Sequence, residues 1–194
     1  MSPVSYAAAE KALESRLSAG AFAHSTRVAQ AAAELAQRVG VDAELARLGG
    51  LLHDWNREVP WEDLMSAAVA AGVEVTEADA AVPYLLHART GALALREAFP
   101  ALQDEVVSAV ARHTVGSAEM TDLDKVVYIA DMIEPGRVYD GVESLRRLAR
   151  AEPLDELFAA AYQQSITYLI TSRKRIHPET VAVWNALIAG GRDE

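Results

Sequence analysis

A histidine and an aspartate stand side by side at positions 53 and 54, directly after the apolar segment Gly50-Leu51-Leu52. The sequence contains no cysteine, so imidazole and carboxylate groups are the side chains left to bind a transition metal. Adjacent residues of a helix point about 100° apart, and both members of this pair can reach one ion only where a helix ends. A carboxylate at that end also meets the negative pole of the helix dipole, which favours a nearby cation. The pair therefore indicates a metal site at a helix terminus.

Three more histidines and one more aspartate extend this pattern. His24, His87 and His113 each fall on the inner face or at the end of a predicted helix, and Asp131 falls near the end of another. Taken singly, a buried histidine is more often a hydrogen-bonded core residue than a metal ligand. As a set, however, the histidines and aspartates come from several helices and include the ligand types of iron, manganese and zinc. The set predicts a divalent metal site without choosing among these metals.

Helices must position these side chains, because alanine is frequent and alternating β-branched runs are scarce. The apolar spacing predicts an all-α fold with helices over residues 6–18, 23–39, 43–53, 61–71, 76–81, 84–99, 102–113, 122–133, 142–151, 154–172 and 179–189. Gly20 and Gly40 are expected to end the first two helices, and Asp42 to cap the third. Thr121 and Asp124 have the spacing of a capping box. No repeat, low-complexity tract or linker interrupts the pattern, so residues 1–194 are expected to form a single domain.

The net charge and composition of the sequence limit the kinds of partner that the protein is expected to bind. The formal net charge of −10 argues against nucleic-acid binding, because phosphate backbones are held mainly by clustered lysine and arginine. No apolar run reaches membrane-spanning length, and the first residues lack the basic and apolar parts of a signal peptide. We therefore expect a cytoplasmic protein with no nucleic-acid or membrane partner. The sequence also lacks P-loop, dinucleotide-binding and nucleophile-elbow motifs.

The order His24, His53-Asp54, Asp131 resembles the HD-domain superfamily of metal-dependent phosphohydrolases. Longer segments extend the likeness to the YqeK family of symmetrical bis(5′-nucleosyl)-tetraphosphatases; these segments are His24 to Val28, Gly50 to Asp54, His87 to Gly91, His113 to Gly116 and Ile129 to Arg137. The resemblance covers about residues 21–148 and continues weakly into the last helices. It implies that the fold is an HD-domain-like helical bundle.

This resemblance implies that the substrate is a dinucleoside polyphosphate, diadenosine tetraphosphate, which is hydrolysed to two ADP molecules. It also implies one or two divalent metal ions, with iron preferred to manganese or zinc, in a protein that is often a homodimer. The positions that match ligands of the principal metal are His24, His53, Asp54 and Asp131. His87 and His113 match positions that hold a second metal or touch the phosphates. Arg57 stands where the family usually has lysine, which keeps a cation but replaces a point donor with a planar fork.

The residues suggest a mechanism in which a metal lowers the pKa of bound water towards about 7 and so produces a hydroxide nucleophile. The His53-Asp54 pair is expected to be catalytic, with Asp54 orienting the water or accepting its proton. Arg27, Arg57 and Arg137 are candidates for binding the phosphates, because guanidinium groups bind phosphate through two hydrogen bonds. For Arg27 and Arg137 a surface ion pair is an equally good interpretation.

Four alternatives stay open at this point. The chain could be an HD-type phosphohydrolase of nucleoside mono-, di- or triphosphates or of a guanosine alarmone, an HD-type oxygenase, a non-catalytic nucleotide-binding module, or a helical interaction protein with incidental histidines. Thr114 either donates to a phosphate oxygen or belongs to a helix-terminal turn. Trp55 and Tyr84 either stack on adenine or pack in the core or at its rim. Glu134 either supports a metal-bound water or pairs with an arginine, and His177 is expected to be a peripheral turn residue.

Overall fold

The structure, a computed structural model, describes residues 4–190 of the chain. Within that range the chain forms eleven α-helices and one 3₁₀ helix and contains no β-strand, which confirms the predicted all-α fold. The elements are α1 (Tyr6–Glu14), α2 (Ala19–Val39), α3 (Ala43–Leu52), α4 (Trp61–Ala70), α5 (Glu77–Ala81), η1 (Pro83–Leu85), α6 (Leu86–Ala98), α7 (Asp104–Arg112), α8 (Asp122–Ile133), α9 (Val142–Ala151), α10 (Leu154–Thr171) and α11 (Pro178–Gly190).

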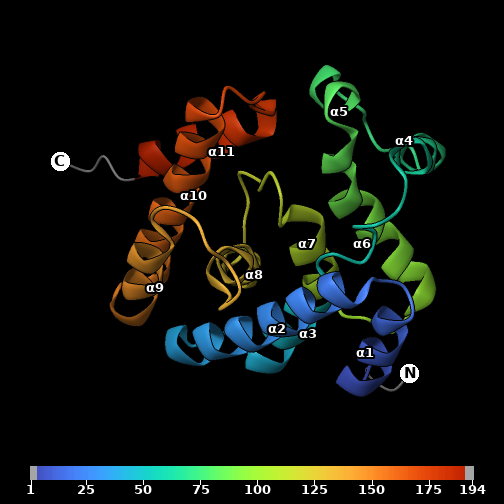
Figure 1. The fold of residues 1–194 in the computed structure, drawn as a ribbon, viewed down its shortest axis with the longest axis horizontal. Helices are drawn as coiled ribbons and strands as arrows, with labels where there is room; N and C mark the ends of the chain where they lie inside the picture. Colours follow the sequence, from blue (N-terminus) through green and yellow to red (C-terminus); the bar gives the residue numbers. More distant parts are fainter. Residues whose placement is uncertain (1–3, 191–194) are drawn as a thin grey trace.

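Helix α8 lies at the centre of the molecule (Figure 1). α2 and α3 pack closely on each other and on α8, α7 lies beside α8, and α9 to α11 cover its other side. α4 to α6 form the opposite end of the molecule, where α6 packs on α7. The buried face of α8 includes Val126, Val127, Ile129 and Ala130, which belong to one large hydrophobic cluster. Side chains from α2, α3, α6, α7 and α8 can therefore meet in one interior region.

A glycine allows α2 and α3 to approach each other closely. A Cβ atom at Gly50 would lie 2.9 Å from the Cα of Ala29 and 2.9 Å from the carbonyl oxygen of Val28, both in the backbone of α2. Any larger residue would therefore push the two helices apart. His24 lies one turn before Val28, and His53 lies three residues after Gly50. The close crossing thus brings together the ends of two helices that both carry a histidine.

Local signals predicted several helix ends correctly. α8 and α9 have the predicted bounds, and Thr121 with Asp124 forms the predicted capping box. Asp42 caps α3 through its side chain, and Gly40 ends α2 in the left-handed conformation with φ 79°. The first two helices differ from the prediction, because the Ser18 hydroxyl accepts a hydrogen bond from the Ala21 N–H and starts α2 at Ala19. The predicted role of Gly20 as a helix end is therefore wrong, since it lies in the first turn of α2.

The segment around Pro83 also differs from the prediction of one continuous helix. Residues Pro83–Leu85 form the 3₁₀ helix η1, and α6 begins only at Leu86. Inside α6, a Cβ at Gly91 would lie 3.5 Å from the backbone nitrogen of Asn56, which is ordinary van der Waals contact. The helix therefore packs against the turn that follows α3, but this packing does not require glycine.

Among the described residues, no helix has the length and apolar character needed to span a membrane.

Candidate metal centre

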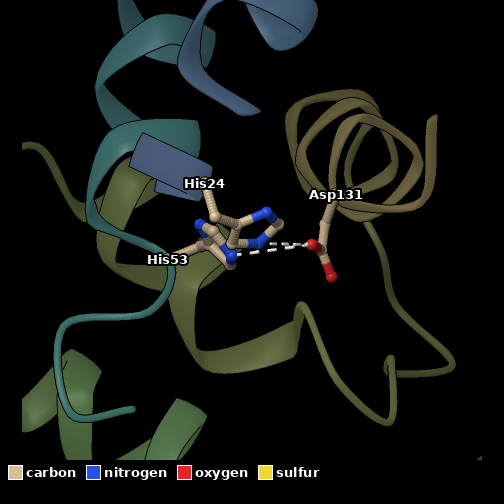
Figure 2. Close-up of side chains that lie close together, drawn as sticks. All are labelled: His24, His53 and Asp131. Carbon is tan, nitrogen blue, oxygen red and sulfur yellow. Dashed lines mark ion pairs between the residues drawn. The ribbon is translucent and has the colours of Figure 1, made fainter. Parts of the chain in front are cut away.

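Two imidazoles and a carboxylate from three helices converge at the centre of the fold. Figure 2 shows His24 of α2 and His53 at the end of α3 directed toward the carboxylate of Asp131, which comes from α8. The Oδ1 atom of Asp131 lies 3.0 Å from His24 Nε2 and 3.7 Å from His53 Nε2. One ligand atom from each of the three residues falls within 4.8 Å of the other two. This spacing is suited to a single ion that all three residues could bind.

Asp54 joins this group to a second pair of histidines. Its side chain is fully buried, and its Oδ2 atom lies 3.2 Å from His53 Nε2 and 3.7 Å from His24 Nε2. The other carboxylate oxygen, Oδ1, lies 3.2 Å from His87 Nε2 and 3.6 Å from His113 Nε2. The carboxylate of Asp54 therefore stands between two pairs of imidazoles, with one oxygen atom directed to each pair.

The tautomers of the buried histidines leave their ligand atoms free. In His53, His87 and His113, Nδ1 lies 2.6–2.8 Å from the main-chain carbonyl oxygen three residues earlier. A carbonyl accepts hydrogen bonds only, so each Nδ1 must carry the proton and each neutral ring presents a lone pair at Nε2. This hydrogen bond on the far side of the ring is the usual arrangement for a metal-binding histidine.

Two observations show that the site fits a bound cation. His87 Nε2 and His113 Nε2 are 3.1 Å apart, so that in the neutral rings two lone pairs face each other and repel. His53 Nε2 is buried and has no hydrogen-bond partner among the described residues, although the oxygen of Asp54 is near. A buried acceptor without a donor is costly unless a cation or a proton satisfies it. Nitrogen and oxygen donors without thiolates match iron, manganese or zinc.

The electrostatics keep both carboxylates ionised. Burial alone would raise the pKa of Asp131, but the contact with His24 and the charges of His53 and Arg137 outweigh burial and lower it. The pKa of Asp54 is held well below its usual range because the surrounding histidines likewise outweigh its burial. Burial lowers the pKa of His113, which favours its neutral form. Ionised carboxylates and a neutral His113 are in the protonation states that bind metals. Burial would lower the pKa of His53, but Asp54 and Asp131 outweigh burial and raise it, so a cation bound at His53 Nε2 would displace a proton.

Glu134 forms a second layer behind His24. Its buried carboxylate lies 3.1 Å from His24 Nδ1 and accepts hydrogen bonds from Arg27 Nε at 2.6 Å and from the Gly136 N–H at 2.6 Å. Arg27 therefore lies behind His24, with 40% of its side chain exposed, and is directed to Glu134. Of the two roles considered for Glu134, the structure shows pairing with an arginine, and it adds a contact to a candidate ligand. Only the tertiary fold reveals that contact, because Glu134 is 110 residues from His24 in the sequence.

A pocket of about 300 Å³ opens beside the histidines, and its lining includes Arg57, Tyr84, His87, His113, Thr114 and Arg137. Arg57 Nη1 donates to Asp54 Oδ2 at 3.1 Å, and its guanidinium lies 5.3 Å from the centre of the Tyr84 ring. Arg137 donates through Nη2 to the Asp131 carboxylate and through Nε to the Asp131 carbonyl oxygen. Thr114 Oγ1 is buried without a hydrogen-bond partner among the described residues. The structure thus brings Arg57, Thr114 and Arg137 together in this pocket, whereas Arg27 is not among its lining residues.

Trp55, Tyr84 and His177 differ in how deeply they are buried, and this decides where each belongs. Trp55 is buried and packs against Phe99 with ring centres 5.7 Å apart, so it is a core residue. Tyr84 remains partly exposed at the rim of the pocket, beside His87. The prediction that His177 is peripheral is wrong, because it is buried and its Nε2 lies 3.4 Å from Asp79 Oδ1. His177 does precede α11 as expected, but it belongs to a separate polar cluster.

Three further residues line the pocket that were not predicted as site residues: Tyr128, Met132 and Ser165. Tyr128 OH donates to Ser165 Oγ at 2.9 Å, which connects α8 to α10 at the pocket wall. Ser165 lies in the predicted helix over residues 154–172, where no motif or charged residue pointed to a site, so no local signal could have identified it.

Comparison with known proteins gives consistent similarities. The model of the HD domain family matches residues 21–136. The chain is 29% identical to the symmetrical bis(5′-nucleosyl)-tetraphosphatase of Bacillus subtilis over 87% of this chain and 90% of that protein. It is 30% identical to the protein of the same name from Halalkalibacterium halodurans, over 86% of this chain and 88% of that protein. Among solved structures, it is similar to a predicted HD superfamily hydrolase involved in NAD metabolism from Clostridium acetobutylicum, with 31% identity and a TM-score of 0.90 over 97% of this chain and 100% of that one.

Proposed function

The chain belongs to the HD domain family, a family of metal-dependent phosphohydrolases, and from this membership we propose that it cleaves diadenosine tetraphosphate symmetrically into two ADP molecules. The substrate follows from the names of the relatives, which are symmetrical bis(5′-nucleosyl)-tetraphosphatases. The observation that carries the hydrolytic assignment is the Asp54 carboxylate between two pairs of imidazole Nε2 atoms.

His24, His53, Asp54 and Asp131 are proposed to hold the principal metal, and His87 and His113 a second ion together with Asp54. When bound, a divalent metal supplies Lewis acidity, which makes water a nucleophile near neutral pH and polarises phosphoryl oxygens. We propose iron as this metal, with manganese and zinc as the other candidates for the same donor set. The hydrogen bonds from Nδ1 to main-chain carbonyl oxygens keep the rings of His53, His87 and His113 oriented.

The proposed reaction consumes one water molecule. The water oxygen forms a bond to one of the two inner phosphorus atoms, and the bond from that phosphorus to the central bridging oxygen breaks. That oxygen leaves with the second ADP, and one proton of the water is lost to an acceptor, a role proposed for the ionised carboxylate of Asp54. Both products are ADP because the central bridge divides the four phosphates equally.

Arg57, Arg137 and Thr114 are proposed to bind the phosphates. Each lines the pocket beside the histidines, and a guanidinium can bind two phosphate oxygens at once. Arg57 uses Nη1 to contact Asp54 and could direct its remaining N–H groups to the substrate. Arg27, which was also a candidate, would act through Glu134 and His24, because its guanidinium pairs with Glu134.

Product analysis tests the proposal. Protein loaded anaerobically with Fe²⁺, and in parallel with Mn²⁺ or Zn²⁺, is incubated with diadenosine tetraphosphate, and the nucleotides are separated by ion-exchange chromatography. We expect ADP as the sole nucleotide product. AMP together with ATP would contradict symmetrical cleavage, and turnover of other nucleotides alone would favour a different phosphohydrolase. Full activity without oxygen would exclude an oxygenase.

Two variants separate catalysis from a binding role. His53→Ala and Asp54→Ala are expected to lose both bound metal and turnover while keeping the helical content measured by circular dichroism. Unchanged turnover in either variant would contradict the site assignment. We also propose, on the family resemblance, a cytoplasmic location and a homodimer, which cell fractionation and sedimentation equilibrium would test.

A further inference from the structure

A larger groove of about 870 Å³ adjoins the metal-centre pocket. It lies between residues 136–140, which follow α8, and one face of α10. Four residues line both hollows: Asp131, Met132, Arg137 and Ser165. The two hollows therefore adjoin each other at these four residues. The metal-centre pocket alone has about 300 Å³, which is at the small end of ligand sites, whereas the groove is near the upper end of the usual range of about 300–1,000 Å³.

Hydrogen bonds fix both walls of this groove. The hydroxyl of Tyr139 donates to the carbonyl oxygen of Met132 at 2.9 Å, which holds the loop on α8. The amide nitrogen of Gln164 on α10 donates to the carbonyl oxygen of Asp140 at 2.9 Å, which holds the loop on α10. Gly141 follows with φ 97°, and a Cβ there would lie 3.0 Å from Gln164 Oε1. The groove is thus already formed in the protein, so a ligand would lose little binding free energy in ordering its walls.

The groove offers an exposed aromatic side chain. Tyr168 lies one turn after Ser165 on α10 and has 53% of its surface exposed. Lys174 Nζ donates to its hydroxyl at 2.8 Å, which restrains the outer edge of the ring. Arg137 lines both the groove and the metal-centre pocket, and Lys174 Nζ lies 4.8 Å from the centre of the Tyr168 ring. An exposed tyrosine ring and Arg137 in one groove suit a ligand with phosphates near Arg137 and an aromatic base against Tyr168.

We infer that this groove binds one nucleoside of the dinucleoside polyphosphate, with its base against the ring of Tyr168 and the attached phosphates passing Arg137 toward the histidines. The inference rests on the proposed function for the identity of the substrate. Stacking on an aromatic side chain tolerates any base, because every base has a π-face. Tyr168 is therefore a binding residue for the nucleoside and takes no part in bond cleavage.

Binding of ADP, inorganic pyrophosphate and diadenosine tetraphosphate to the metal-loaded protein tests this inference. Tyr168→Ala should weaken ADP binding about tenfold in isothermal titration calorimetry and raise the KM for diadenosine tetraphosphate similarly, with kcat nearly unchanged. Binding of pyrophosphate, which has no nucleoside, should not change. Tyr168→Phe should lose much less affinity than Tyr168→Ala, because it keeps the ring and loses only the hydrogen bond from Lys174. Ile170→Ala is the matched control, since Ile170 is exposed on the same helix but does not line the groove.

Three results would overturn the inference: unchanged ADP affinity and KM in Tyr168→Ala, an equal loss for pyrophosphate, or a loss in Tyr168→Phe as large as in Tyr168→Ala. Failure of the proposed function has a different signature. If the wild type does not hydrolyse diadenosine tetraphosphate, the kinetic comparison disappears, but the comparison of ADP with pyrophosphate still reports whether a nucleoside occupies the groove.

Discussion

Replacing Gly50 with alanine should destabilise the fold and weaken metal binding in the same variant. The added methyl group would lie 2.9 Å from two backbone atoms of α2, the Cα of Ala29 and the carbonyl oxygen of Val28. Backbone atoms cannot rotate away as a side chain could, so α2 and α3 must separate. Because His24 and His53 lie on these two helices, their separation also changes the distance between two candidate metal ligands.

The size of the effect follows from two opposing contributions. Overpacking of this kind costs about 1–3 kcal/mol, and a clash with two backbone atoms of α2 places Gly50→Ala in the upper half of that range. Alanine also gains about 1 kcal/mol over glycine from its helix propensity. The expected net loss is about 1–2 kcal/mol in the free energy of unfolding, which corresponds to roughly 2–8 °C in Tm for a chain of this size.

Urea unfolding and competitive metal titration of the same preparations would measure both effects. Gly20→Ala is the matched control, because Gly20 also lies in a helix and a Cβ there would meet nothing within 4 Å. We expect the control to be as stable as the wild type or slightly more stable. Equal unfolding free energies and equal metal affinities for Gly50→Ala and Gly20→Ala would refute the argument that the helix crossing positions the two histidines.

Three further predictions concern charge and metal. Glu134→Gln should weaken metal binding by about 10- to 100-fold, because it removes the carboxylate that orients His24; Glu143→Gln, at an exposed pair, should leave the affinity unchanged in the same chelator competition. The hydrogen bonds from Arg89 and Thr76 outweigh the burial of Asp79 and lower its pKa, so Asp79 adds stability above its unfolded pKa of about 3.9 that is lost as the pH falls through the lower folded value. The gap in unfolding free energy between wild type and Asp79→Asn should therefore be wide at neutral pH and shrink at acidic pH, and a constant gap would contradict the prediction. Saturation with Mn²⁺ at about 100 times Kd should raise Tm by roughly 5–10 °C over chelator-treated protein in differential scanning fluorimetry, and no shift would argue against a cation between the histidines.

Local sequence signals predicted the parts of the structure that local physics determines. Thr121 and Asp124 fixed the start of α8, and Gly40 fixed the end of α2, because capping depends on a few neighbouring residues. The set of histidines and aspartates was also apparent, since helical spacing puts each on an inward face. The structure adds the distances that bring these side chains to one place.

Contacts between distant segments could not be predicted in this way. Arg27 and Glu134 are separated by 107 residues, so no sequence rule could decide whether Arg27 faces the substrate or a carboxylate. His177 was misjudged for the same reason, because its burial depends on Asp79 from a segment almost a hundred residues earlier. The error at Gly20 was local, since Ser18 is also a good N-cap and starts the helix earlier than glycine alone would suggest.

The anchoring of three histidines to carbonyl oxygens within their own helical turn has a mechanical consequence. Each ring is rigidly attached to its helix end, so the position of the ligand atom reports the position of the helix. A small tilt of α6 relative to α7 would be transmitted to the gap between His87 and His113 without any side-chain rotation. The buried residues of α7, such as Val106 and Val110, therefore set the width of the gap from a distance, and substitutions there should tune the preference for ions of different radius.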